Sequence, residues 1–473
     1  MRLVKDMGEN LTDIIEFFAW INQILQAATQ AIWLPIFLFI IAIILRAKPG
    51  RAFRAALTIG IAWIGIQLVI GLFFGGYVGV SIPSAAAAIR DRFQLALEGI
   101  DVGWPPMAAI AYGTIVGAMI IPIGIVVNLI LLALGLTKTL DIDIWNFWHW
   151  AFVGGTIYTL TRDLGLSLLA AITYEVFCLK VADWTVKPLW DTFPGYKGYS
   201  IPQGGGWVGS IPFIAIFKPI VDKIPTPRAD PETLRQKLGV LGEPAVLGLI
   251  IGIVLGILAG FNTIQIALLG MTAAAIMILL PRMISLLMEG LTAIADAITE
   301  YVRKRFAGRE IYIGMDAAIA IGHPTTIAAA LILIPIILVW AAALSPIGLI
   351  KILPFADLAA TPFFVVAVVP FMRRDLVKSI ILGSLVMLCW QILGSWWAPI
   401  LTETAILIGW QIPTGVVLAG SIWLQPMIVP AYFAYSINSA AYGLGYILLL
   451  IIIVITLFAD RSKTLRSIFG KLY

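Results

Sequence analysis

The two histidines of this chain each follow a carboxylate inside strongly apolar sequence. His149 ends the run Asp141-Ile-Asp-Ile-Trp-Asn-Phe-Trp-His, and His323 ends Gly314-Met-Asp-Ala-Ala-Ile-Ala-Ile-Gly-His. Ionisable groups at membrane depth are costly, so they are rare and mark transport paths or bound substrate. The two pairs therefore predict one polar site in which carboxylate and imidazole groups bind a polar ligand.

Helical spacing supports one pair better than the other. Asp316 and His323 are seven residues apart, which is two helical turns, so their side chains can share a face if the segment is helical. Asp143 and His149 are six residues apart, which fits less well. A single buried histidine is more often a core residue whose hydrogen bonds are made within the protein. Only the presence of two carboxylate–histidine pairs favours a binding site.

Two further carboxylates are candidates for the same site. Asp101 precedes Trp104, and aromatic faces pack on the C–H faces of polyols while carboxylates accept their hydroxyl hydrogens. The alternative is a helix cap beside an interfacial tryptophan. Glu243 lies where a polar linker meets an apolar run, so a cavity carboxylate and a solvated boundary residue are equally supported. Three other charged residues are expected to be helix caps or loop-end charges: Asp357, Glu175 and Arg162.

The elements that hold these residues are predicted to be membrane helices. Of the 473 residues, 61% are hydrophobic and 12% charged, and the mean hydropathy is +1.00, far outside the usual soluble range. Apolar stretches of ~20 residues, enough to span a bilayer core, recur from Ile32 to Ala459. The sequence therefore predicts an all-α polytopic membrane protein with about ten or eleven transmembrane helices.

Several kinds of chemistry are disfavoured by the motifs. Cys178 and Cys389 lie singly in apolar runs, so we expect inert thiols and neither a disulfide nor a metal site. The sequence contains no Walker loop, dinucleotide fingerprint or nucleophile elbow, so nucleotide hydrolysis within this chain is not expected, and neither is a cofactor. The basic residues flank apolar spans and form no domain of their own, which argues against nucleic acid as a partner.

Breaks in the apolar pattern divide the chain into two halves. The segments 201–212 and 353–362 are rich in proline and glycine, and irregular backbone survives at membrane depth only against protein or a water-filled cavity. We expect re-entrant or broken helices there, at corresponding places in an inverted repeat of 31–221 against 244–430. Such breaks are the best sequence pointer to a transporter's binding site.

The expected organisation has five segments. They are an N-terminal amphipathic interfacial segment (1–30), a first membrane half (31–221), a polar linker (222–243), a second membrane half (244–460) and a basic cytoplasmic tail (461–473). Within the second half, glycines recur every four residues from Gly248 to Gly260, a spacing typical of close helix packing.

Taken together, several collinear motifs resemble the galactitol-type enzyme IIC, the membrane permease of the bacterial phosphoenolpyruvate-dependent sugar phosphotransferase system. The resemblance covers about residues 30 to 460 and rests on these motifs: Asp101-Val-Gly-Trp-Pro105, Asp143-Ile-Trp-Asn-Phe-Trp-His149, Ile201-Pro-Gln-Gly204, Gly242-Glu-Pro244, Pro281-Arg282, Gly314-Met-Asp316 to His323, and Leu353-Pro-Phe-Ala-Asp357.

The resemblance implies a homodimer whose protomer has a scaffold domain and a mobile substrate-carrying core. It also implies that a separate IIB subunit carries a phosphocysteine, recharged by a IIA subunit, and that a sugar alcohol such as galactitol is phosphorylated as it moves inward. This chain would then be the membrane subunit of a phosphotransferase complex whose phosphoryl carrier lies on another chain.

Residue chemistry and the resemblance converge on one set of side chains. Carboxylates and histidines would hold polyol hydroxyls, Glu243 or Asp316 would accept the proton, and amides would add hydrogen bonds. The expected substrate-binding residues are Asp101, Asn146, His149, Gln203, Glu243, Asp316 and His323. The alternative function is an ion-coupled secondary transporter of an unmodified polyol or sugar, working through the same carboxylates.

The basic segments of the chain predict its orientation in the membrane. Basic residues follow the first apolar run at 46–54 and close the chain at 461–471, so the positive-inside rule predicts an external N-terminus and a cytoplasmic C-terminus in the cell membrane. Single cysteines introduced between 46 and 54 should react with impermeant thiol reagents only after the cells are opened. Labelling of these positions in intact cells would contradict the predicted orientation.

Overall fold

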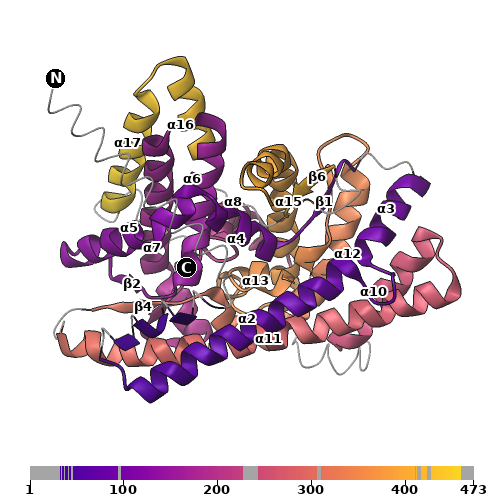
Figure 1. The fold of residues 1–473 in the computed structure, drawn as a ribbon, viewed down its shortest axis with the longest axis horizontal. Coiled ribbons are helices and arrows are strands. Elements are labelled where there is room, and N and C mark those ends of the chain that lie inside the picture. Colours follow the sequence, from indigo (N-terminus) through magenta and orange to yellow (C-terminus); the bar gives the residue numbers. More distant parts are fainter. Residues whose placement is uncertain are drawn as a thin grey trace.

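The computed structural model describes residues 46–93, 97–226, 243–305, 310–358, 360–410, 417–422 and 428–459, with Ile412 and scattered positions between 32 and 43. The expected interfacial segment, most of the linker and the basic tail lie outside these residues. The described chain is mostly helical (Figure 1). Five of its helical stretches are long and apolar enough to cross a membrane: Pro49–Val69, Ile115–Ala133, Leu164–Thr192, Pro324–Leu344 and Leu376–Leu407. The predicted class of polytopic helical membrane protein is confirmed.

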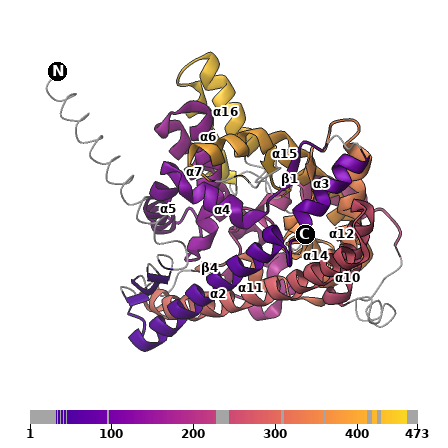
Figure 2. The ribbon, with the colours of Figure 1, turned by 45° about the vertical axis from the view of Figure 1, so that its right-hand side comes forward.

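One group of helices forms a layer along one side of the molecule. Figures 1 and 2 both show α2 and α11 running side by side, with α10 and α3 beside them. These helices, here called the scaffold layer, are α2 (Pro49–Gly75), α3 (Ile82–Phe93), α10 (Pro244–Ala259) and α11 (Thr263–Arg305).

The glycine repeat explains why α10 and α11 lie so close. A Cβ atom at Gly252 would lie 2.5 Å from the Leu269 carbonyl oxygen, and one at Gly248 would lie 2.8 Å from that of Ala273. Any larger residue would force the helices apart, so the expectation that these glycines serve helix packing is confirmed.

The remaining helices surround the buried aromatic core. In the first half they are α4 (Trp104–Gly113), α5 (Ile115–Ala133), α6 (Phe147–Thr161), α7 (Leu164–Thr192) and α8 (Ile211–Val221). In the second half they are α12 (Pro324–Leu344), α13 (Thr361–Val365), α14 (Val368–Phe371), α15 (Leu376–Leu407), α16 (Ile428–Ala440) and α17 (Leu444–Phe458).

The apolar run 147–180 is two helices, because the chain turns sharply at Arg162. This residue adopts a left-handed conformation (φ 56°) at the end of α6, and the Asp163 carboxylate then accepts a hydrogen bond from the Leu166 N–H at the start of α7. Arg162 is therefore at a helix end, as expected.

In the described part of the chain, six short parallel strands, which the sequence did not predict, join the two halves. They are β1 (Gly99–Asp101), β2 (Thr139–Asp141), β3 (Tyr199–Ser200), β4 (Tyr312–Gly314), β5 (Ile352–Leu353) and β6 (Leu418–Gly420). One sheet has the order β5-β1-β6 and the other β2-β4-β3. The first strand of each half thus lies between the second and third strands of the other half, which is the exchange expected of a two-fold internal repeat.

Both predicted breaks in the helical pattern are present, and they contact each other. Residues 201–210 form turns and a short 3-10 helix before α8, and the segment after β5 continues only as a 3-10 helix (Ala356–Leu358) and the short α13 and α14. Gly206 lies directly against the carbonyl oxygen of Phe363, so the absence of a side chain permits the contact.

Replacing Gly206 with alanine should destabilise the protein. The added methyl group would collide with the Phe363 backbone and force the two broken segments apart, at a cost of about 1–3 kcal/mol. Thermal unfolding of the purified protein in detergent should show a lower melting temperature. Gly195→Ala is the matched control, because a Cβ there meets nothing within 4 Å. Equal melting of both variants would contradict the packing argument.

Candidate functional site

Parallel pairing of β2 with β4 brings together the carboxylates that follow these strands. Asp141 is opposite Gly314 in the register, and Asp143 and Asp316 each lie two residues further along. The Asp143 carboxylate accepts hydrogen bonds from the backbone N–H groups of Asp316 and Trp145, each at 3.1 Å. These two aspartates, from opposite halves of the chain, therefore lie side by side in the interior.

Asp141 and Asn146 extend the same cluster. The Asn146 amide nitrogen donates to both Asp141 carboxylate oxygens, at 3.1 and 3.2 Å, and the Asp143 N–H donates to Asp141 at 3.1 Å. All these side chains are buried. We call Asp141, Asp143, Asn146 and Asp316 the carboxylate cluster.

The loop after β3 closes over this cluster. The Gln203 side chain hydrogen-bonds the Asp316 carboxyl group, and its Oε1 atom accepts from the Trp207 N–H at 2.9 Å. Tyr174 donates its hydroxyl hydrogen to the Gly204 carbonyl oxygen. A Cβ at Gly204 would lie 2.7 Å from the Cβ atom of His149, so the loop also abuts this histidine. The structure thus brings together four predicted residues: Asn146, His149, Gln203 and Asp316.

Burial dominates the electrostatics of the cluster. Burial, followed by repulsion from Asp143, raises the pKa of Asp316 above its usual range, and burial raises the pKa of Asp143. Both residues lie in loops outside the long apolar helices. Neighbouring carboxylates in a dry site cannot all ionise without cost, so the cluster can hold and release a proton.

The cluster is rich in hydrogen-bond acceptors. Within the part of the chain that the structure describes, Asn146 Oδ1 and both carboxylate oxygens of Glu175 are buried without a hydrogen-bond donor. Glu175 lies close enough to Asp141 for their charges to interact, and beside Phe147 near Gly124. Unpaired buried acceptors are costly, and a ligand bearing hydroxyl donors, or a proton, would remove that cost.

Asp101 belongs to a second cluster at the other sheet. Its carboxylate accepts from the N–H groups of Phe355 at 3.0 Å, Asp357 at 2.9 Å and Gly103 at 3.1 Å. Asp357 accepts from the Trp104 N–H at 2.8 Å and from the Ser421 hydroxyl at 2.5 Å. These hydrogen bonds link Asp101 to the loops next to the β5-β1-β6 sheet, whereas Asp316 lies next to the β2-β4-β3 sheet.

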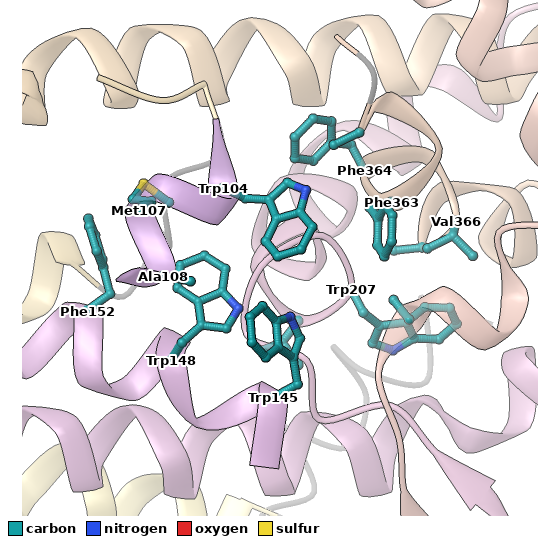
Figure 3. Packing of buried hydrophobic residues seen from close by; sticks show 14 of the residues in the cluster. Trp104, Met107, Ala108, Trp145, Trp148, Phe152, Trp207, Phe363, Phe364 and Val366 are labelled. Carbon is teal, nitrogen blue, oxygen red and sulfur yellow. The ribbon is translucent and has the colours of Figure 1, made fainter. Parts of the chain in front are cut away.

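Aromatic rings lie between the two clusters. Trp145 contacts Trp104 with ring centroids 5.6 Å apart and Trp63 at 4.7 Å. Figure 3 shows Trp104, Trp145 and Trp148 gathered in the core, with Phe363 across from them. The backbone N–H of Trp104 donates to Asp357 and the backbone N–H of Trp145 donates to Asp143, so two residues whose rings touch are each hydrogen-bonded to a different cluster.

The other two predicted residues have different surroundings. Glu243 is exposed at the start of α10, in the scaffold layer. His323 is half-buried at the start of α12, where its Nδ1 atom accepts from the Thr325 N–H at 3.2 Å and its ring contacts that of Phe193 at 5.2 Å. His149 instead stacks on Trp148 at 3.9 Å. Each histidine therefore has its own set of neighbours.

Glu175 lies elsewhere than expected, and Asp141 was not among the predicted binding residues. Asp357, expected to be a cap or loop-end charge, is buried in a short 3-10 segment and accepts the N–H of Trp104 at the start of α4, as a cap does. Glu175 was expected to have the same role, but it is fully buried in the middle of α7. The Asp141-Ile-Asp143 pair was visible in the sequence, yet only the strand pairing reveals that Asp141 joins the cluster. An acidic residue inside an otherwise apolar helix could have identified Glu175.

Comparison with known proteins identifies the family of this chain. The model of the EIIC-GAT family, described as the PTS system sugar-specific permease component, matches residues 23–415. A putative permease IIC component of Escherichia coli K12 is 38% identical over 378 residues, covering 79% of this chain and 84% of the relative. The galactitol-specific EIIC component of the same strain is 34% identical over 360 residues, covering 75% of this chain and 77% of the relative. The chain therefore belongs to the EIIC-GAT family of sugar-specific permease components of the phosphotransferase system.

Proposed function

We propose that this permease carries a sugar alcohol of the galactitol type across the membrane and that a separate IIB subunit phosphorylates it. The observation that carries the proposal is the buried carboxylate cluster beside tryptophan rings, together with the oxygens of Asn146 and Glu175 that find no donor among the described residues. A polyol offers a hydroxyl donor on each carbon and apolar C–H faces between them. The similarity to a galactitol-specific EIIC component supports the same substrate class.

Asp316 is the better of the two candidate bases in this structure. It is buried in the cluster with Gln203 and Asp143, whereas Glu243 is exposed on the scaffold layer. A raised pKa brings a carboxylate closer to the working pH, which favours proton acceptance from a hydroxyl. In the transfer, the polyol oxygen would form the new O–P bond and lose its proton to Asp316. The S–P bond of the donor would break and leave its electrons on the cysteine thiolate.

The scaffold domain of the permease would be the scaffold layer, and its mobile core would be the remaining helices. The scaffold layer is held by close glycine contacts and exposes apolar side chains such as Leu68, at 70%, and Ile264, at 72%, which would face lipid or a second protomer. The site lies among the other helices. We assign the dimer contact to the scaffold layer and substrate movement to the core.

Ion-coupled transport is the second candidate, and Glu175 favours it. A buried carboxylate without a donor on a membrane helix is suited to carrying a proton. Uptake by membrane vesicles that lack IIB and phosphoenolpyruvate separates the two functions. Accumulation of free polyol driven by a proton gradient alone would support the second and contradict the first.

Asp316→Asn should reduce phosphorylation more than polyol binding. The amide keeps the size and a hydrogen-bonding capacity but cannot accept the proton, so we expect a loss of about a hundredfold or more in turnover. Polyol binding should weaken by less than about tenfold. Both are measured in vesicles, the first with excess phosphorylated IIB and the second by equilibrium binding.

Two further variants serve as comparisons for Asp316→Asn. Glu403→Gln removes an exposed carboxylate from α15 and should change neither property. His149→Ala opens space beside Gly204 and should weaken binding and turnover together. Equal losses of binding and turnover in Asp316→Asn would argue against its role as base.

Removing both cysteines should leave phosphorylation intact. Cys178 is buried and Cys389 half-buried on membrane helices, so neither is suited to receive a phosphoryl group from a soluble protein. A double Cys178→Ser, Cys389→Ser variant should keep turnover within about threefold of the unmodified protein, since these changes are small. Loss of phosphorylation with normal folding and polyol binding would contradict the assignment of the carrier cysteine to IIB.

A further inference from the structure

A cavity of about 380 Å³ lies outside the carboxylate cluster, between the end of α7 and the turn that joins α14 to α15. Lys187 and Asp191 line it from α7, and Arg373 and Arg374 line it from the turn. The Lys187 side chain is 69% exposed, and both arginines are exposed. The cavity is therefore open to a ligand from outside the core.

Cations outnumber anions in this cavity. Among the residues that the structure describes, its charged lining is Lys187, Arg373 and Arg374 and the carboxylate of Asp191, which pairs with Lys187. Arg374 donates to the backbone carbonyl oxygens of Asp191 and Thr192, which fixes the turn against α7. The excess positive charge fits an anion, and guanidinium groups match the geometry of phosphate oxygens.

The turn holds its arginines in an uncommon backbone conformation. Arg373 and Arg374 have φ values of 52° and 63°, consecutive left-handed conformations that cost energy for residues other than glycine. Backbone hydrogen bonds to Pro370 and Val369 carbonyl groups maintain the turn. Such outliers persist where the surrounding structure enforces them and are often found at ligand sites.

The cavity is linked by side-chain contacts to the segment that carries Asp316. Phe193, which follows α7, packs on His323, and Arg374 is near enough to that histidine for their charges to interact. Tyr196 donates its hydroxyl hydrogen to the Ile319 carbonyl oxygen in the 3-10 turn Ala317–Ala320, which Asp316 caps. The residues that follow α7 thus connect the edge of the basic cavity to the turn that Asp316 caps.

The same end of the molecule carries the basic end of α11. Trp190 donates from its ring nitrogen to the Tyr199 carbonyl oxygen in β3, so the end of α7 lies at the β2-β4-β3 sheet. Strand β4 follows the basic residues 303–305 after a few positions. Under the positive-inside rule this end is cytoplasmic, where a soluble phosphoryl donor would approach.

We propose that this cavity receives the phosphoryl group of the phosphorylated IIB subunit, with Arg373 and Lys187 holding its oxygens next to the substrate path. The inference rests on the proposed function and assigns it a donor-binding site. Both side chains would bind the phosphoryl oxygens of the incoming phosphocysteine without taking the polyol proton. Recognition would therefore depend on the phosphoryl group rather than on the IIB surface alone.

The test uses the full-length permease in nanodiscs with its cognate IIB subunit. Affinity is measured for phosphorylated IIB and for IIB whose carrier cysteine is replaced by serine, and turnover is measured against the concentration of phosphorylated IIB. The variants are Arg373→Gln and Lys187→Gln, with Arg373→Lys retaining the charge. Lys223→Gln is the matched control, since it removes an exposed cation outside the cavity. Melting temperature and equilibrium polyol binding confirm folding.

Arg373→Gln and Lys187→Gln should each raise the KM for phosphorylated IIB about tenfold or more, with kcat at saturating donor and polyol affinity little changed. The preference for phosphorylated over unphosphorylated IIB should fall by the same factor, and Arg373→Lys should recover part of it. Lys223→Gln should leave the preference unchanged.

Other outcomes overturn the inference in distinguishable ways. An unchanged KM with normal turnover would exclude the cavity as the donor site while leaving the proposed function intact. Equal effects of Lys223→Gln would indicate general surface attraction. Weaker binding of the phosphorylated polyol alone would make the cavity a product site, and a response only to anionic lipid in the nanodisc would make it a lipid site. Absence of IIB-dependent phosphorylation in the unmodified permease would contradict the proposed function itself.

Discussion

The rest of the structure depends on one constraint: backbone polar groups that leave a helix inside an apolar environment must find partners within the protein. This chain breaks its helices in both halves, at 201–210 and 354–360, close to its buried polar groups. Short strands next to these breaks pair their backbone groups with strands of the other half. The central strand of each sheet comes from the opposite half to its two neighbours. The carboxylates of Asp101, Asp143 and Asp357 accept further backbone N–H groups across the same junctions.

The two sheets of this junction differ in the hydrogen-bond acceptors that they leave available. At the β5-β1-β6 end, backbone and hydroxyl donors surround the carboxylates of Asp101 and Asp357, which suits them to hold loops together. At the β2-β4-β3 end, Asn146 and Glu175 retain acceptor oxygens for which the described part of the chain supplies no donor. A similar arrangement of strands and acidic loops can therefore serve mainly as structure at one end and offer hydrogen-bond acceptors at the other.

Much of this architecture could be predicted from the sequence, and the failures have physical causes. Hydropathy identifies the helices, and the helix breakers around Gly204 and Pro354 locate the broken segments. The resemblance to galactitol-type permeases is confirmed by the family comparison. Strands of two or three residues carry too little periodic signal to be recognised, so the pairing that unites Asp143 with Asp316 was not predicted. Burial of Glu175 depends on which helix faces meet, and local sequence does not encode that.

The exchange of central strands has a consequence for synthesis of the protein. Strand β1 ends at Asp101, but its neighbours begin at Ile352 and Leu418, so about 250 residues must follow before its backbone can pair. At ordinary translation rates this delay is on the order of tens of seconds. During that interval Gly99 to Asp101 must stay hydrated, or be shielded by the insertion machinery or a chaperone. Each sheet contains strands from both halves, so neither sheet can be completed until the second half has been synthesised.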